Sequence, residues 1–181
     1  MKNVFKSSIL SLVLLSCGSG EDREGVTDTI IPQKDSMVPI VSDTTPKVTG
    51  VGGIFFFSDD PKEAKAWYEK NLGLVTNDYG STFEFRNANR PDEVNYLQWS
   101  VFKKGNKYFS PSKKEFMINY RVQNMEALVK RFKENGVTIL DTIEVYDYGK
   151  FLHIMDPEGN KIELWEPIDS VLSKIGSKTT K

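Results

Sequence analysis

The sequence predicts an α+β fold built from two βαβββ modules. The first observation is an internal repeat, in which residues 58–73 align with residues 122–136. A repeat of roughly 60 residues is too long for a solenoid unit and suits a duplicated supersecondary module. The second observation is that both copies close on matching strands, one carrying Gln98 and the other Glu163. Two such modules can place both residues in one shared cavity.

The first module opens on residues 51–57, a nearly continuous apolar run that is typical of a strand buried on both faces. Asp60 then caps a helix with proline at its first position, because its carboxylate can accept the free N–H groups of the first turn. The apolar stripe of this helix includes Trp67, which is predicted to pack into the core, and Gly73 ends the helix. Three short strands follow, separated by turn residues, at 74–78, 82–86 and 94–102.

The second module repeats this order. Its first strand is predicted over residues 115–122, Asn124 caps its helix and Gly136 ends that helix. The turn at residues 156–160 is a strong signal, because proline presets its first position and glycine supplies a positive φ. The remaining strands are predicted at 138–145, 150–155 and 160–166.

The first 46 residues are expected to lie outside the domain. A basic start followed by an apolar run of about ten residues is typical of a secretory signal peptide and is too short to cross a bilayer. Residues 14–17 resemble the lipobox of bacterial lipoproteins. That resemblance implies a signal peptide over 1–16 and lipidation of Cys17, with palmitate in the anchor. Residues 17–46 lack any helical or strand period and are predicted to be a flexible tether.

The domain is expected over residues 47–168, followed by a C-terminal tail over 169–181. Lys and Arg number 24 against 25 Asp and Glu, and no basic stripe appears, so a nucleic-acid partner is excluded. Cys17 is the only cysteine, which leaves the domain without a disulfide or a catalytic thiol. The lipid anchor implies attachment to the bacterial cell envelope, at the outer membrane or cell surface rather than the inner membrane, because acidic residues follow Cys17.

Three segments carry a family resemblance: residues 52–56, residues 67–73 and the more specific run at 156–165, Asp-Pro-Glu-Gly-Asn-Lys-Ile-Glu-Leu-Trp. They resemble the vicinal oxygen chelate family, which includes glyoxalases, extradiol dioxygenases and bleomycin resistance proteins. The resemblance implies a glyoxalase-like fold, in which two modules form a pseudo-twofold curved sheet around one small-molecule cavity. It also allows a homodimer, because such modules can pair within one chain or across two.

Catalytic members of that family typically bind a divalent metal through residues on the first and last strands of each module. Carried over by position, these places hold Gly53, Gln98, Met117 and Glu163. Glycine has no side chain, a thioether is soft, and a carboxamide offers only a neutral oxygen to a hard cation. The resemblance therefore implies a degenerate metal site and no cofactor, unless another group supplies a ligand for a displaced metal.

His153 is the only histidine and the one imidazole that could supply such a ligand. Strand alternation allows His153 and Glu163 to lie side by side, as a two-ligand metal site or as a catalytic base with its orienting partner. The alternative is a histidine that only fills the sheet surface. Polar or aromatic residues expected in the cavity wall as ligand contacts are Gln98, Tyr96, Ser100, Asn119, Arg121, Lys161 and Trp165, with loop aromatics such as Tyr108 beside them. Arg121 could equally face solvent in a salt bridge, and each aromatic could be packing.

Three functions follow as hypotheses. The first is a lipid-anchored domain that binds a small molecule without the four-ligand metal chemistry of the family. The second is a lyase-, isomerase- or dioxygenase-like enzyme that uses Glu163 with His153 and a displaced metal. The third is a non-catalytic interaction domain of the cell envelope.

Overall fold

The computed structural model describes residues 43–88, 90–175 and 178–180, which belong to one compact unit, Val41–Lys181. The signal peptide predicted over 1–16, the lipidation site Cys17 and nearly all of the tether lie outside the described residues. Within the described ranges, no helix combines the length and apolar composition that crossing a membrane requires.

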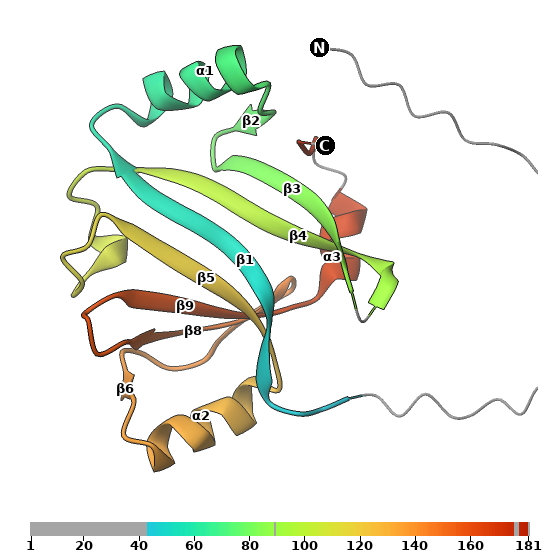
Figure 1. Cartoon of the computed structure of the whole chain (residues 1–181), viewed down its shortest axis with the longest axis vertical. Coiled ribbons are helices and arrows are strands. Elements are labelled where there is room, and N and C mark those ends of the chain that lie inside the picture. Colours follow the sequence, from blue (N-terminus) through green and yellow to red (C-terminus); the bar gives the residue numbers. More distant parts are fainter. Residues whose placement is uncertain (1–42, 89, 176–177, 181) are drawn as a thin grey trace, which may run out of the picture. The chain divides into compact units, whose positions relative to one another are not determined.

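The strands of the described residues form one curved nine-stranded sheet, in the order β2-β3-β4-β1-β5-β9-β8-β6, with β7 paired to β8 (Figure 1). Each half follows the order βαβββ, with the short β7 added in the second half. The predicted α+β class and duplicated module are therefore confirmed. The strands are β1 (Lys47–Ser58), β2 (Thr76–Asn77), β3 (Gly80–Asn87), β4 (Arg90–Lys103), β5 (Phe116–Gln123), β6 (Thr138–Ile139), β7 (Glu144–Tyr146), β8 (Gly149–Met155) and β9 (Lys161–Pro167).

The pairing of the strands makes the two halves equivalent. In the first half β1 pairs with β4 in parallel, and in the second half β5 pairs with β9 in parallel. β1 and β5 pair with each other in antiparallel fashion at the centre of the sheet (Figure 1). The strand order read from either edge towards the centre is therefore the same, which is the arrangement expected of a pseudo-twofold axis between β1 and β5.

The helix caps form as predicted. α1 (Pro61–Leu72) begins after Asp60, whose carboxylate accepts the N–H groups of Lys62 and Glu63. α2 (Met125–Glu134) begins after Asn124, whose side chain accepts the N–H of Ala127. The helices differ in how they contact the sheet. α2 buries apolar side chains in a cluster that comprises Met125, Leu128, Val122, Leu152, Ile154 and Leu164.

The expected burial of α1 is wrong. None of its residues is buried, and Trp67 is 55% exposed. The contact between α1 and the sheet passes mainly through Tyr68, whose ring lies 4.7 Å from the ring of Trp99 on β4 and 6.4 Å from that of Phe56 on β1. Trp67 lies beside Tyr68 in an edge-to-face contact on the outer side of this arrangement. An apolar stripe therefore marked the helix correctly without showing how deeply it packs.

The exposure of Trp67 gives a first testable prediction. We expect Trp67→Ala to lower the free energy of unfolding by about 1 kcal/mol or less, whereas the same change at a buried tryptophan costs about 3 to 5 kcal/mol. Urea unfolding followed by circular dichroism measures the difference. A loss above about 3 kcal/mol would show that this ring is buried after all.

Candidate functional site

A cavity of about 860 Å³ lies between the two halves of the sheet. Both halves contribute to its wall, through residues on β1, β3 and β4 and through residues on β5, β7, β8 and β9. Gln98 and Glu163, the matching residues of the two closing strands, both lie in this wall. A cavity of this size suits a small organic molecule.

Glu163 is the buried carboxylate of the wall, only 3% exposed, and three side chains lie within hydrogen-bond distance of it. Its neighbours on both sides of β9 supply donors, because Asn119 on β5 and His153 on β8 are its register partners. Asn119 Nδ2 donates to Glu163 Oε1 at 2.6 Å, and His153 Nε2 lies 3.0 Å from Glu163 Oε2. The hydroxyl of Tyr108 also donates to Oε2. These bonds offset the cost of burying a carboxylate.

His153 joins Glu163 to a second carboxylate. Its Nδ1 lies 2.6 Å from Asp141 Oδ2, and its backbone N–H donates to Asp141 Oδ1 at 2.8 Å. Burial lowers the pKa of His153, but the hydrogen bond and charge of Glu163 together with the bond to Asp141 outweigh it, so the pKa of His153 stands above its ordinary value. As an imidazolium, His153 donates from both ring nitrogens and separates the two negative charges.

The raised pKa of His153 has a consequence for stability. The folded state holds the proton of His153 more tightly than the unfolded chain does, in which the pKa of histidine has its ordinary value of 6.5. The contribution of protonated His153 to the free energy of unfolding is therefore complete below pH 6.5. It is lost as the pH rises through the pKa that His153 has in the folded state. His153 is the only histidine of the chain, so its imidazole resonances in an NMR titration are unambiguous. We expect a midpoint above 6.5, and a lower midpoint in Asp141→Asn. A midpoint at or below 6.5 in the wild type would contradict the geometry.

Gln98 lies in a neutral network on the other half. Its Oε1 accepts from Thr82 Oγ1 at 3.0 Å, and its Nε2 donates to Ser100 Oγ at 3.1 Å and to the carbonyl of Tyr79 at 3.2 Å. Ser100 and Tyr96 lie in the cavity wall as predicted. The two halves thus present different chemistry at matching places, a carboxylate bonded to histidine on one side and a carboxamide network on the other.

The register of β5 corrects the alignment of the two modules. Gly53 pairs with Gln98 in the first half, and Asn119 pairs with Glu163 in the second half. The counterpart of Gly53 is therefore Asn119 and not Met117, because β1 runs further before its helix than β5 does. Met117 is 0% exposed and packs in the core with Phe55 and Phe109. It is not among the residues that line the cavity.

The residues at these places do not fit the divalent metal that catalytic members of the resembled family bind. A Cβ at Gly53 would lie 2.7 Å from the ring of Phe55, so a ligating side chain there would need the ring to move. Gln98 and Asn119 carry amides, and the Glu163 carboxylate already accepts from Tyr108 and Asn119 beside His153. Among the described residues, no group of three or more His, Cys, Asp or Glu side chains is placed to hold a metal ion.

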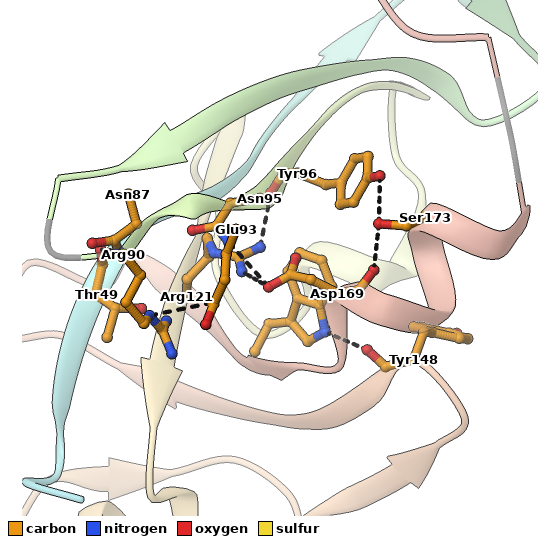
Figure 2. A network of polar contacts seen from close by, with 11 residues as sticks. Thr49, Asn87, Arg90, Glu93, Asn95, Tyr96, Arg121, Tyr148, Asp169 and Ser173 are labelled. Atoms are coloured by element: carbon orange, nitrogen blue, oxygen red, sulfur yellow. Dashed lines mark hydrogen bonds and ion pairs between the residues drawn. The ribbon is translucent and has the colours of Figure 1, made fainter. Parts of the chain in front are cut away.

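Arg121 is not among the residues that line the cavity, so the expected ligand contact is wrong; it forms a salt bridge, as the alternative expected, but a buried one that does not face solvent. It is only 1% exposed, and its guanidinium bonds to Asp169 at 2.5 Å and to the carbonyl of Tyr96 at 3.0 Å (Figure 2). Asp169 begins α3 (Asp169–Ile175), which packs beside β4. Ser173 on the same helix bonds to the Tyr96 hydroxyl at 2.9 Å (Figure 2). Arg121 therefore fixes α3 to the sheet.

The segment expected to be a tail belongs to the domain. Leu172 on α3 lies in the cavity wall. Further along the chain, Thr180 forms a parallel bridge with Phe83 on β3, and its N–H donates to the carbonyl of Thr82 at 2.8 Å. The predicted boundary at residue 168 is thus too early, because α3 contacts β4 and Thr180 contacts β3.

Aromatic rings form much of the remaining wall. Trp165 is stacked on Phe151 at 5.8 Å, and Tyr146 is stacked on Tyr148 at 5.4 Å, all four on the second half. Tyr108 is stacked on Phe102 at 5.4 Å and belongs to the loop after β4. Trp165 therefore lies in the wall as predicted, where flat apolar surfaces surround the polar group at Glu163.

Two residues of the site were missed by the sequence prediction. Asp141 lies between β6 and β7, in a stretch that reads as one continuous strand, so its approach to His153 was not expected. The signal that could have shown it is a carboxylate directly after the apolar pair Ile139-Leu140, where a strand with a buried face would carry no charge. Tyr108 was expected only as a loop aromatic, and its bond to Glu163 connects residues too far apart in the sequence to be predicted.

Comparison with known proteins gives a family match over most of the chain. A family model described as Glyoxalase/Bleomycin resistance protein/Dioxygenase superfamily matches residues 50–164. No curated protein gives a significant match. Similar solved structures include methylmalonyl-CoA epimerase from Mycobacterium tuberculosis, with 20% identity, a TM-score of 0.47 and coverage of 71% of this chain and 95% of that one. The Mn(II)-bound glyoxalase from Novosphingobium aromaticivorans has 16% identity and a TM-score of 0.44, over 67% of this chain and 40% of that one.

Proposed function

Because this chain belongs to the glyoxalase/bleomycin resistance protein/dioxygenase superfamily, we propose that it binds a small organic molecule in the cavity between its two halves. The observation that carries the proposal is the buried Glu163, held by Asn119, His153 and Tyr108 in the wall of that cavity. Apolar pockets commonly use a few such polar groups to orient a ligand.

A screen of small organic compounds tests the proposal. The protein from Gly18 onward is examined by thermal shift, and hits are measured by calorimetry. Ser100→Trp places a large side chain in the wall of the cavity and is expected to abolish binding of true hits. Lys130→Ala, at an exposed position of α2, is the matched control and should leave binding unchanged. Hits that bind equally well to Ser100→Trp, or the absence of any hit, would overturn the proposal and favour the interaction-domain hypothesis.

A second candidate is an enzyme that transfers protons, because Asp141, His153 and Glu163 form one hydrogen-bonded series at the cavity. In a lyase or isomerase of this kind, Glu163 would take a proton from a substrate carbon next to a carbonyl group, and His153 would hold it in place. NMR in D₂O detects such exchange in carbonyl compounds that bind. Exchange that persists in Glu163→Gln would exclude this role.

The proposal includes the predicted anchor at Cys17, through which the tether would hold the domain at the bacterial cell envelope. We expect Cys17→Ala to lose incorporation of labelled palmitate and to move the protein from the membrane fraction to the soluble fraction. Ser19→Ala is the matched control. Labelling that survives in Cys17→Ala would contradict the predicted lipidation site.

A further inference from the structure

Tyr108 occupies part of the cavity that the proposed function assigns to a ligand. We infer that Tyr108 is an internal substitute for that ligand, and that the ligand is a hydroxylated aromatic compound whose hydroxyl group takes the place of the Tyr108 hydroxyl on Glu163. The inference rests on the proposed function and names the chemical class of the molecule that binds.

The contacts of the Tyr108 side chain are those that a bound phenol would make. Its hydroxyl donates to Glu163, and its ring stacks on Phe102 at 5.4 Å with an interplanar angle of 7°. The edge of the His153 ring lies against it at 5.6 Å, and Lys161 Nζ is 5.1 Å from its centre. All four partners belong to β4, β8 and β9, so they stay in place when the Tyr108 side chain leaves.

The backbone of Tyr108 is held independently of its side chain. The neighbouring Phe109 is 1% exposed and stacks on Phe57 at 4.2 Å. Lys161 Nζ donates to the backbone carbonyl of Tyr108 at 2.7 Å, and Asn106 Oδ1 accepts its N–H at 2.8 Å. The Tyr108 side chain is itself 39% exposed. Rotation about its side-chain bonds can therefore move the ring towards solvent while the loop stays fixed.

The chemistry at Glu163 favours a neutral donor. Burial and the negative charge of Glu163 raise the pKa of Tyr108, so its hydroxyl remains protonated and donates. A ligand phenol in the same place would be held in the same form, whereas a methyl ether has no proton to donate. A carboxylate-bearing ligand would meet the charge of Glu163 at close range. A ligand phenol and the phenol of Tyr108 would make the same contacts and therefore compete for one site. Occupancy of the site by Tyr108 lowers the apparent affinity of the ligand.

Chemical complementation tests this inference. Tyr108→Ala removes the internal phenol, and the probes are 4-methylphenol, which is the missing side chain, and 4-methylanisole, which lacks the donor. We expect 4-methylphenol to bind Tyr108→Ala at least ten-fold more tightly than 4-methylanisole, as a hydrogen bond to a charged acceptor provides. Its binding to the wild type should be weaker, because Tyr108 competes. Calorimetry gives both affinities, and the NMR signals of His153 report binding at the site.

Two further variants separate the effect of the hydroxyl contact with Glu163 from the effect of the volume that the Tyr108 side chain vacates. In Tyr108→Ala combined with Glu163→Gln, the preference for 4-methylphenol should fall several-fold. Tyr108→Phe keeps the ring but removes its competing hydroxyl, and should bind 4-methylphenol more tightly than the wild type does. This variant keeps the test decisive if Tyr108→Ala does not fold. Tyr146→Ala, which removes another aromatic ring from the wall, is the control and should show no gain.

Equal binding of the two probes to Tyr108→Ala, or no binding of 4-methylphenol to that variant or to Tyr108→Phe, would overturn the inference. The proposed function would still stand if other compounds bind in a way that Ser100→Trp abolishes. If the compound screen also fails, the proposed function itself falls. The two failures are therefore distinguishable.

Discussion

Replacing Asp169 by alanine is expected to lower the free energy of unfolding by about 3 to 5 kcal/mol, because it leaves Arg121 buried without its counter-charge. Arg121 is 1% exposed, and its other polar contact is the carbonyl of Tyr96. Its guanidinium also lies over the rings of Phe85 and Trp165, at 5.8 Å and 5.0 Å from their centres, and these rings help to separate it from solvent. Urea unfolding of the variant measures the loss.

Two controls make this prediction specific. Ser170→Ala changes an exposed neighbour on the same helix and should alter stability by no more than about 0.5 kcal/mol. Arg121→Met with Asp169→Leu replaces the pair by apolar side chains and should recover much of the loss, since a buried ion pair is often no better than packed hydrophobic residues. If Asp169→Ala behaves like Ser170→Ala, the ion pair does not hold α3 to the sheet.

The parts of the fold that depend on local chemistry could be predicted from the sequence. Asp60 and Asn124 cap their helices because of what their own side chains can accept, and the turn at residues 156–160 follows from proline and glycine. Packing depth could not be predicted in the same way. An apolar stripe containing Trp67 defines a helix whichever partner covers it, and here Trp67 is exposed while Tyr68 contacts Trp99 of the sheet.

The same distinction applies to the candidate site, where the positions set by the repeat could be predicted and those set by packing could not. The repeat correctly placed Gln98 and Glu163 in one cavity, because matching strands of a duplicated module meet across the pseudo-twofold axis. Met117 was aligned with Gly53 in place of Asn119 because the two modules have different lengths of chain between the first strand and the helix, and the alignment had no gap there. Arg121 alternates onto the cavity face as expected, but the helix α3 covers it, and a tail of mixed polarity gave no sign of that.

Replacing Glu163 by alanine is the second large effect that we expect, with a loss of about 3 kcal/mol in the free energy of unfolding. The carboxylate accepts from Asn119 and Tyr108 and lies beside His153, so its removal leaves several buried or half-buried donors without their acceptor. Buried polar groups without partners cost about 1 to 3 kcal/mol each, and access to the cavity allows water to replace part of the loss. The pKa of His153 should fall at the same time, because Glu163 is the first of the charges that raise it.

Gln98→Ala is the matched control, because Gln98 holds the corresponding place on the other half of the sheet. Its hydrogen bonds to Thr82, Ser100 and Tyr79 are neutral, so its loss should cost only about 1 kcal/mol and leave the pKa of His153 unchanged. A larger loss from Gln98→Ala than from Glu163→Ala would mean that the neutral network, and not the charged one, stabilises the cavity. In that case the hydrogen bond from Tyr108 to Glu163 would contribute little free energy, and a ligand phenol would gain little by replacing Tyr108 on Glu163.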